Sequence, residues 1–142
     1  MEIRKLSVED CIRYKDELVN FIYESNLNCA LNNGYSIENA KNKFQELKQY
    51  IFEDKAIVYG AITQDILCGF VWAYKSPFRE DINRLYVSII NVGERHRSKS
   101  VGKQLLFQLE KEAIKKGYCA DKSSAQVSLF TFHFYIFTQT KQ

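Results

Sequence analysis

The sequence is poor in the residues that build metal sites, disulfide frameworks and membrane spans. Its 142 residues include two histidines and four cysteines, and the cysteines, Cys11, Cys29, Cys68 and Cys119, form no C-x-x-C pair. We therefore expect buried, reduced thiols and no metal site. No apolar run approaches the ~18 residues of a membrane helix, so we expect no membrane partner either.

The chain also has no large excess of charge of one sign. The chain has 20 Lys plus Arg against 17 Asp plus Glu, a formal net charge of +3. This excess of positive charge is smaller than a dedicated nucleic-acid binder would have. It is more compatible with an anionic ligand bound at one local site. The N-terminal segment 1–5 lacks an apolar signal core, so the expected location is cytoplasmic.

What the chain does contain is typical of one packed domain. Hydrophobic residues make up 46% of the sequence and aromatic residues 14%, which argues for a globule with a single core. No internal repeat, linker or low-complexity tract divides residues 1–142. We expect a single domain over the whole chain.

The hydrophobic patterns predict the element order β-α-α-β-β-β-α-β. This order indicates an α+β (mixed α/β) fold, with a central, mostly antiparallel sheet flanked by helices. The first half should contain a strand at 3–6, a helix from 8 to about 24 after the Ser7 cap, a loop at 25–35 and a helix from 36 to about 52. The second half should contain strands at 55–62, 66–74 and 83–92, a helix at 101–116, and a tail at 126–137 that forms one long strand or two short ones.

A basic, serine-rich loop joins the third of these central strands to the best amphipathic helix of the chain. It spans residues 93–103 and has the sequence GERHRSKSVGK. The unpaired N–H groups of a first helical turn converge on one point, and the helix dipole adds positive potential there. The loop is therefore a candidate phosphate site.

The spacing of this loop resembles the acetyl-coenzyme A signature of the GNAT N-acetyltransferase superfamily. There the pattern is Arg or Gln, two residues, Gly, any residue, then Gly or Ala, and it follows a fourth strand that carries Val five residues before the Arg. In this chain Val92 precedes Arg97 and the pattern ends at Gly102. Ser100 stands where glycine is usual, which is tolerable if the backbone there is near helical, and its hydroxyl can donate to a phosphate oxygen. The resemblance is strongest over residues 1–118.

The resemblance implies a GNAT-like fold that binds acetyl-coenzyme A without a metal. Backbone N–H groups of residues 98–103 would surround the pyrophosphate, and cationic side chains would add compensating charge. The end of the strand would pair through its backbone with the pantetheine arm. The predicted cofactor-binding residues are Ile90, Val92, Arg97, Ser98, Lys99, Ser100, Val101, Gly102 and Lys103.

The implied activity is transfer of acetyl to a primary amine of a small molecule or peptide, by direct attack of the amine. Many family members place a Glu on the fourth strand, and the position that aligns with it is Ser88, which cannot act as a base alone but can order water. The thiolate's proton donor is commonly a Tyr in a last helix. Tyr135 is the candidate here, although the alternation around it also fits a buried strand.

The tail, residues 119–142, departs from the family pattern because it lacks the usual Asn, the Gly-Phe pair and a helical periodicity. An exposed aromatic strand is an aggregation risk. We expect the tail to pair either with the edge of the sheet or with a second copy of the chain, which would give a homodimer through this strand.

Two other functions remain open from the sequence. One is a coenzyme A or acetyl-coenzyme A binding module that is catalytically impaired, in keeping with Ser88 and the divergent tail. The other is nucleic-acid binding through Arg95, Arg97, Lys99 and Lys103, which is weaker because no aromatic residues interleave these cations.

Overall fold

The structure is a computed structural model of the chain, and it describes residues 1–27, 34–75, 85–97 and 99–117. The elements in chain order are β1 (Glu2–Lys5), α1 (Val8–Arg13), α2 (Lys15–Leu27), α3 (Ile37–Phe52), β2 (Ala56–Thr63), β3 (Ile66–Lys75), β4 (Leu85–Val92), the 3-10 turn η1 (Glu94–His96) and α4 (Val101–Lys115). The α+β class is confirmed. The expected tail strand lies outside the described residues.

Serines begin the first and third helices as expected. Ser7 accepts from Asp10 N while the Asp10 carboxylate accepts from Ser7 N, which completes a capping box. Ser36 accepts from Asn39 N in the same way. The left-handed Gly117, at φ +88°, follows the end of α4, a position where glycine commonly ends a helix.

The predicted single helix from 8 to 24 is wrong, because Tyr14 divides it into α1 and α2. The Tyr14 side chain is 2% exposed, and its hydroxyl donates to Asp65 in the β2–β3 turn. Helical bonding resumes when Leu18 N donates to Tyr14 O. The second helix also runs three residues past Glu24, so Ser25 and Asn26 are helical and not part of a loop.

The four strands form one antiparallel sheet in the order β1-β2-β3-β4. A two-residue turn at Gln64 and Asp65 joins β2 to β3, and both residues have positive φ, as the twist of a tight hairpin requires. Two bulges interrupt the ladders, at Cys68 in β3 and at Ser88 in β4.

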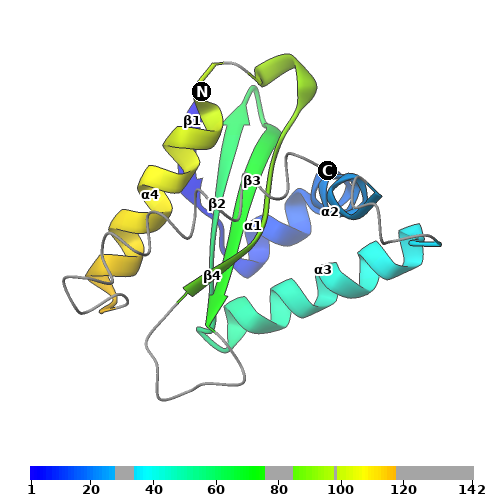
Figure 1. Cartoon of the computed structure of the whole chain (residues 1–142), viewed down its shortest axis with the longest axis horizontal. Helices are drawn as coiled ribbons and strands as arrows, with labels where there is room; N and C mark the ends of the chain where they lie inside the picture. The colour runs from blue at the N-terminus through cyan, green and yellow to red at the C-terminus, as the bar shows by residue number, and fades with distance from the viewer. Residues whose placement is uncertain (28–33, 76–84, 98, 118–142) are drawn as a thin grey trace.

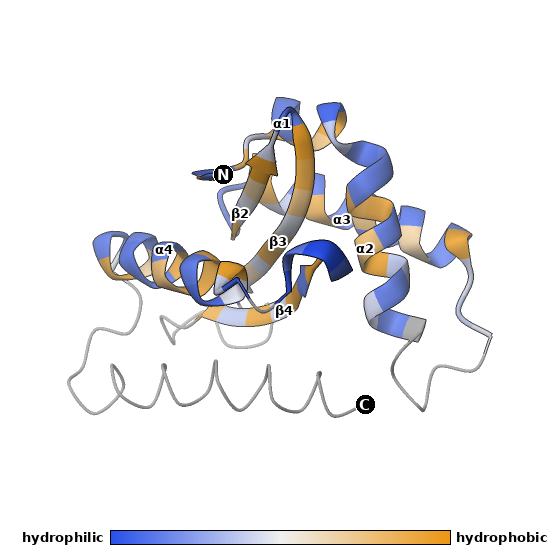
Figure 2. Ribbon diagram, turned by 90° about the horizontal axis from the view of Figure 1, so that it is seen from above, coloured by the Kyte–Doolittle hydropathy of each residue, from blue (hydrophilic) through white to orange (hydrophobic). Residues whose placement is uncertain are grey.

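Helices cover both faces of the sheet (Figure 1), with α1, α2 and α3 on one face and α4 on the other. The apolar colour of the strands in Figure 2 reflects this burial on both sides. One core cluster joins α1–α3 to the sheet through Leu18, Phe44, Phe70 and Trp72. The second joins α4 to the sheet through Val71, Val87, Leu105 and Leu109.

The bulge at Ser88 changes which face of the sheet each later residue of β4 meets. Before it, Leu85 and Val87 pack in the α4 core. After it, Ile89 packs in the α1–α3 core, while Ile90 and Val92 pack against the α4 core. An extra residue reverses the alternation of the strand, so the end of β4 presents Val92 to α4 and Asn91 to α2.

Among the helices that the structure describes, none has the length and apolar character needed to cross a bilayer.

Candidate functional site

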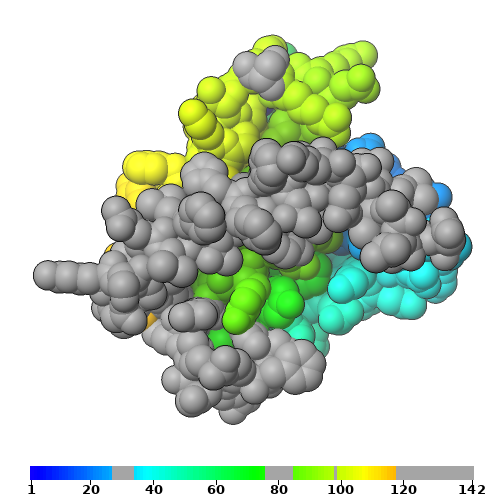
Figure 3. Space-filling view, in the orientation of Figure 1, coloured from blue at the N-terminus to red at the C-terminus, as the bar shows by residue number. Residues whose placement is uncertain are grey.

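The loop between β4 and α4 is short and held at its start. Gly93 N donates to Cys68 O at 2.7 Å, and η1 follows at once. Arg97 is extended, with φ −66° and ψ 155°, and Ser100 turns the chain into α4. Figure 3 shows η1 and the N-terminal end of α4 side by side at the top of the molecule.

A cavity of about 390 Å³ opens beside the N-terminus of α4. Its lining residues come from β4, η1 and the first turn of α4, and they are Val92, His96, Arg97, Ser100, Val101, Gly102 and Lys103. Six of the nine predicted cofactor residues are thus brought together around one space.

The other predicted residues fall around this cavity or beyond the described chain. Ile90 does not line the cavity but lies next to one of its residues, because a Cβ placed on Gly102 would be 3.9 Å from Ile90 Cδ1. Lys99 is exposed and does not line the cavity. The side chains of Ser98 and Tyr135 lie outside the described residues.

The N-terminus of α4 is not capped by a side chain, unlike the starts of α1 and α3. Ser7 and Ser36 each accept from a backbone N–H at 3.1 Å, but Ser100 makes no capping hydrogen bond. The first N–H groups of α4 therefore remain available at the cavity, where the positive end of the helix dipole also lies. Such an end binds an anionic oxygen.

Ser100 adopts the left-handed backbone, with φ +62° and ψ 19°. The sequence allows a serine here on the condition of a near-helical backbone, and the structure differs. Glycine enters the left-handed region without cost, whereas a residue with a Cβ is strained there. The preference of the GNAT pattern for glycine thus has a local physical reason.

Arg97 anchors the loop to the end of β4. Its Nε donates to Val92 O at 2.7 Å, and its Nη2 lies 3.4 Å from Asn91 Oδ1. Part of the guanidinium is therefore engaged in hydrogen bonds within the protein. The positive charges that are less engaged are those of Lys103, at the cavity, and of Lys99, beside it. Sequence reasoning assigns Arg97 to the anion alone.

His96 is a cavity residue that the sequence did not predict. It lies between Arg95 and Arg97, inside the loop already singled out, and its position there is the available signal. From the sequence, a histidine is considered only as a possible metal ligand. No group of three or more His, Cys, Asp or Glu in the described chain could hold a metal ion.

Ser88 is the extra residue of the β4 bulge and is half-buried. A bulge takes a residue out of the regular ladder and redirects its side chain and backbone groups. The predicted water-ordering residue is thus placed at the irregular point of the strand that leads to the cavity.

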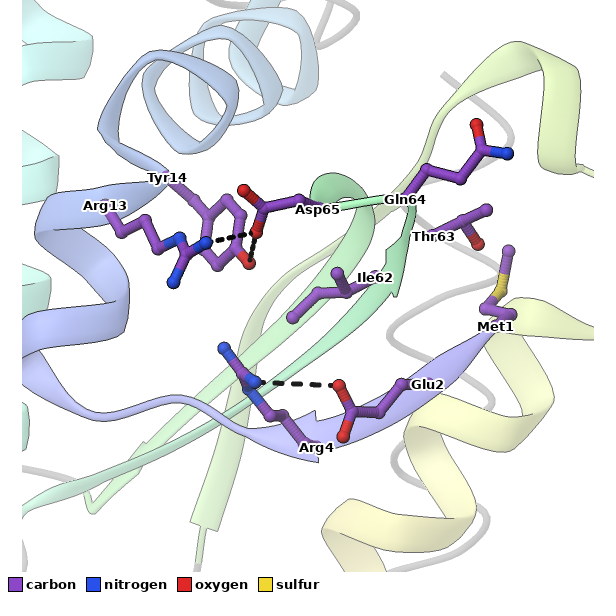
Figure 4. A pocket seen from close by; sticks show the side chains of 9 residues that line it. All are labelled: Met1, Glu2, Arg4, Arg13, Tyr14, Ile62, Thr63, Gln64 and Asp65. Carbon is purple, nitrogen blue, oxygen red and sulfur yellow. Dashed lines mark hydrogen bonds and ion pairs between the residues drawn. The ribbon is translucent and has the colours of Figure 1, made fainter.

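A second cavity, of about 680 Å³, lies at the other edge of the sheet, among β1, α1 and the β2–β3 turn (Figure 4). Its charged groups pair with one another. Arg13 is 2.7 Å from Asp65, and Arg4 is 3.5 Å from Glu2 and 2.9 Å from Asp10. Because each cation already has a carboxylate, this cavity lacks the open donors of the first.

The thiols within the described chain are structural. Cys11 and Cys68 are buried and unpaired, which confirms the expectation for these two. Burial, aided by the charge of Asp10, raises the pKa of Cys11 to about 12, so its thiol stays protonated and is a poor nucleophile.

Comparison with known proteins gives one family. A model of the acetyltransferase (GNAT) family matches residues 20–129. No curated protein matches the chain.

Solved structures share the fold. A GNAT family acetyltransferase from Staphylococcus aureus subsp. aureus has a TM-score of 0.69 and 16% identity, over 83% of this chain and 95% of that one. The PaiA N-acetyltransferase from Thermoplasma acidophilum, in complex with coenzyme A, has a TM-score of 0.63 and 25% identity, over 82% and 74%. An aminoglycoside 6'-N-acetyltransferase complexed with coenzyme A has a TM-score of 0.62 and 22% identity, over 82% and 57%.

Proposed function

Because the match over residues 20–129 shows that the chain belongs to the GNAT family of acyl-coenzyme A dependent N-acetyltransferases, we propose that it transfers acetyl from acetyl-coenzyme A to a primary amine of a small molecule or peptide. The family supplies the donor and the enzyme class. The acceptor and the roles of individual residues are the proposal.

The observation that carries the cofactor assignment is the uncapped N-terminus of α4 at a cavity of about 390 Å³. The backbone N–H groups of residues 100–103 would bind the pyrophosphate, and Lys99 and Lys103 would balance its charge. Gly102 supports this fit. A Cβ there would meet only Ile90 Cδ1, at 3.9 Å, so packing within the protein does not require glycine.

The end of β4 would hold the pantetheine arm. Within the described residues β4 pairs only with β3, which leaves the backbone groups near Ile90 and Val92 on its other edge without a described strand. An amide-bearing chain can add to such an edge. The cofactor supplies an activated acetyl thioester, and a β4 N–H group would stabilise the charge that develops on the acetyl oxygen.

The acid and base roles are assigned to the predicted candidates. Ser88, at the bulge, would order the water that takes the proton of the acceptor ammonium, since a serine is too weak a base alone. Tyr135 would return a proton to the leaving thiolate. Both assignments rest on the family resemblance.

The acceptor side is proposed on the face of the sheet that carries α2 and α3. A half-buried row of tyrosines crosses it, with ring centroids 5.8 Å apart for Tyr50 and Tyr74, and 6.4 Å for Tyr74 and Tyr86. Burial first, then these neighbours and Glu46, raise the pKa of Tyr74. Neutral aromatic faces attract ammonium groups, which suits a cationic amine. An aminoglycoside acetyltransferase is among the similar structures.

The anion site is tested with the double variant Lys99→Ala/Lys103→Ala, which leaves the Arg97 anchor in place. Calorimetry with coenzyme A should show a Kd weakened about ten-fold at low salt, because two charges facing the phosphates are lost. The matched control Lys41→Ala/Lys111→Ala removes two exposed helix cations and should bind normally. Equal affinity of both variants and the wild type for coenzyme A would contradict the assignment of the anion site.

Turnover separates the enzyme from the alternative, a coenzyme A binding module without catalysis, which the absence of a carboxylate at Ser88 favours. Thiol release from acetyl-coenzyme A is measured over a panel of aminoglycosides, polyamines and peptide N-termini. Release with at least one amine supports the transferase. Tight binding without release from any of them supports the module.

A further inference from the structure

A single amide side chain, that of Asn91, bonds both α2 and the cofactor loop. Its Nδ2 donates to Phe21 O and to Ser25 Oγ, each at 3.2 Å. Its Oδ1 accepts from Arg97 Nη2 at 3.4 Å. In Figure 2 the η1 turn accordingly lies between α2 and the N-terminal end of α4.

The orientation of this amide is fixed by its partners. Two acceptors lie on the α2 side and one donor on the loop side, so a flipped amide would set its oxygen against the Phe21 carbonyl and its nitrogen against the guanidinium. The bonds to Phe21 O and from Arg97 would be lost, and only the Ser25 hydroxyl, which can donate as well as accept, could bond the flipped group. The asparagine amide therefore satisfies all three partners, whereas an aspartate would lose the bond to Phe21 O and could accept only from Arg97 and from the Ser25 hydroxyl.

Packing joins the same two elements beside the amide. A Cβ placed on Gly93 would be 3.9 Å from Phe21 Cζ and 3.1 Å from Cys68 O. The Phe21 ring, itself 6.0 Å from the Phe70 ring, thus lies beside the first residue of the loop. Polar and apolar contacts both tie the C-terminal half of α2 to the start of the loop.

The same half of α2 leads to the proposed acceptor side. Asn26 Nδ2 donates to Tyr35 Oη at 3.3 Å, and the rings of Tyr23 and Tyr35 are 6.2 Å apart. The C-terminal half of α2 therefore bonds Asn91, at the end of β4, through residues 21 and 25, and meets the segment that precedes α3 through residues 23 and 26.

We propose that Asn91 is a positioning residue that couples the cofactor loop to α2, so that coenzyme A binding also orders the acceptor-side helix. This inference rests on the proposed function. When the loop is fixed by the bound anion, Arg97 stays at the end of β4 and Asn91 keeps its orientation toward α2. Local unfolding of α2 then becomes rarer, because it must break hydrogen bonds to an Asn91 side chain that is held in place by the fixed loop.

The test is hydrogen exchange with and without coenzyme A, read on peptides covering residues 18–27 and 99–106. In the wild type, coenzyme A should slow exchange in both. In Asn91→Asp the bond to Arg97 remains and the bond to Phe21 O is lost, while the Ser25 hydroxyl can donate to the carboxylate in place of accepting from the amide. Slowing at 99–106 should then persist, while slowing at 18–27 falls by about five-fold, the effect of one net hydrogen bond.

Two further variants keep the result interpretable. Asn20→Asp makes the same chemical change on an exposed position of α2 and should retain both effects. Ser25→Ala removes one acceptor of the amide without adding charge, and should give part of the loss if Asn91→Asp folds poorly.

Each outcome has a distinct meaning. Slowing at 99–106 alone in the wild type overturns the coupling and leaves the cofactor site standing. No slowing at 99–106 overturns the cofactor site itself. Unchanged cofactor-dependent slowing at 18–27 in Asn91→Asp, with faster exchange in the free protein, would make Asn91 a plain stabiliser of α2.

Discussion

Ser100 carries the left-handed backbone that turns the cofactor loop into α4. Its hydroxyl is not used for capping, so it can face a ligand. The cost of this arrangement is conformational, because an L residue with a Cβ rarely adopts positive φ. Ser100 thus combines a hydroxyl that can bind a ligand with a strained backbone conformation.

Replacement of Ser100 by Gly should raise the free energy of unfolding by about 1 kcal/mol, since glycine enters the left-handed region without penalty. Urea denaturation measures the change. The same replacement at Ser36, where φ is −114° and the hydroxyl caps α3, should instead cost a few tenths of a kcal/mol. Equal losses at the two positions would contradict the strain at Ser100.

Residues of the site can be predicted where they lie close together in the sequence, within one recognisable pattern. The pattern from Val92 to Gly102 locates most of the residues around the cavity, but not His96. Asn91 interrupts an apolar run, which is a visible sign, but its partners Phe21 and Ser25 lie about seventy residues away in the chain and only the fold brings them near. The bonds of Arg97 join it to Val92 and Asn91, which are close in the chain, but the turn of the loop that brings them together is not marked in the sequence.

At the scale of elements, two ion pairs hold the C-terminal half of α4. Lys5 Nζ in β1 lies 2.6 Å from Glu112 Oε2, and Lys116 Nζ lies 2.7 Å from Asp54 Oδ1 in the turn before β2. The hydrogen bond from Lys5 lowers the pKa of Glu112 below its ordinary 4.5. These contacts fix α4 against the sheet at the end away from the cavity.

The Glu112 pair makes a pH-dependent contribution to stability. Because the pKa of Glu112 is lower in the folded chain, its contribution is complete above about pH 4.5 and is lost as pH falls through the folded value. Glu112→Gln should therefore lower the free energy of unfolding by about 0.5–1 kcal/mol at pH 7. The difference from wild type should vanish in acid.

Denaturation at a series of pH values checks this, with Glu24→Gln as the control for loss of an exposed helix carboxylate. A difference between wild type and Glu112→Gln that stays constant from pH 7 to pH 3 would show that the ion pair is not its source.

Most elements are predictable because helical and strand periodicities differ. The exceptions are places where a contact distant in sequence decides. Tyr14 divides the first predicted helix, and its hydroxyl bonds Asp65, which lies 51 residues away in the chain. Ser88 bulges within an apolar strand, where neither alternation nor a glycine marks the extra residue.

At the scale of the whole molecule, one sheet separates two cores. Trp72 faces the α1–α3 core and Val71 the α4 core, so successive residues of β3 stabilise opposite halves. Within the described chain the β4 edge has no strand beside it. The sequence assigns residues 126–137 to such an edge, either in the same chain or in a second copy.

If this assignment holds, limited proteolysis of the intact protein should spare residues 126–137, because a paired strand does not fit a protease cleft. Sedimentation then separates the two arrangements, with a monomer for pairing in the same chain and a homodimer for exchange between copies. Rapid cleavage within this segment, together with a monomeric mass, would refute both.

The extra residue in β4 makes chain length at this point a part of the recognition chemistry. If Ser88 were paired with β3 instead of bulging out, no residue would be lost, yet strict alternation would run through the whole of β4. Val92 would then turn toward α2 and Asn91 toward α4, exchanging an apolar cavity wall for an amide. In natural or designed relatives of this chain, a β4 without the bulge should therefore be one residue shorter between Val87 and the loop, because only that length keeps Val92 toward the cavity.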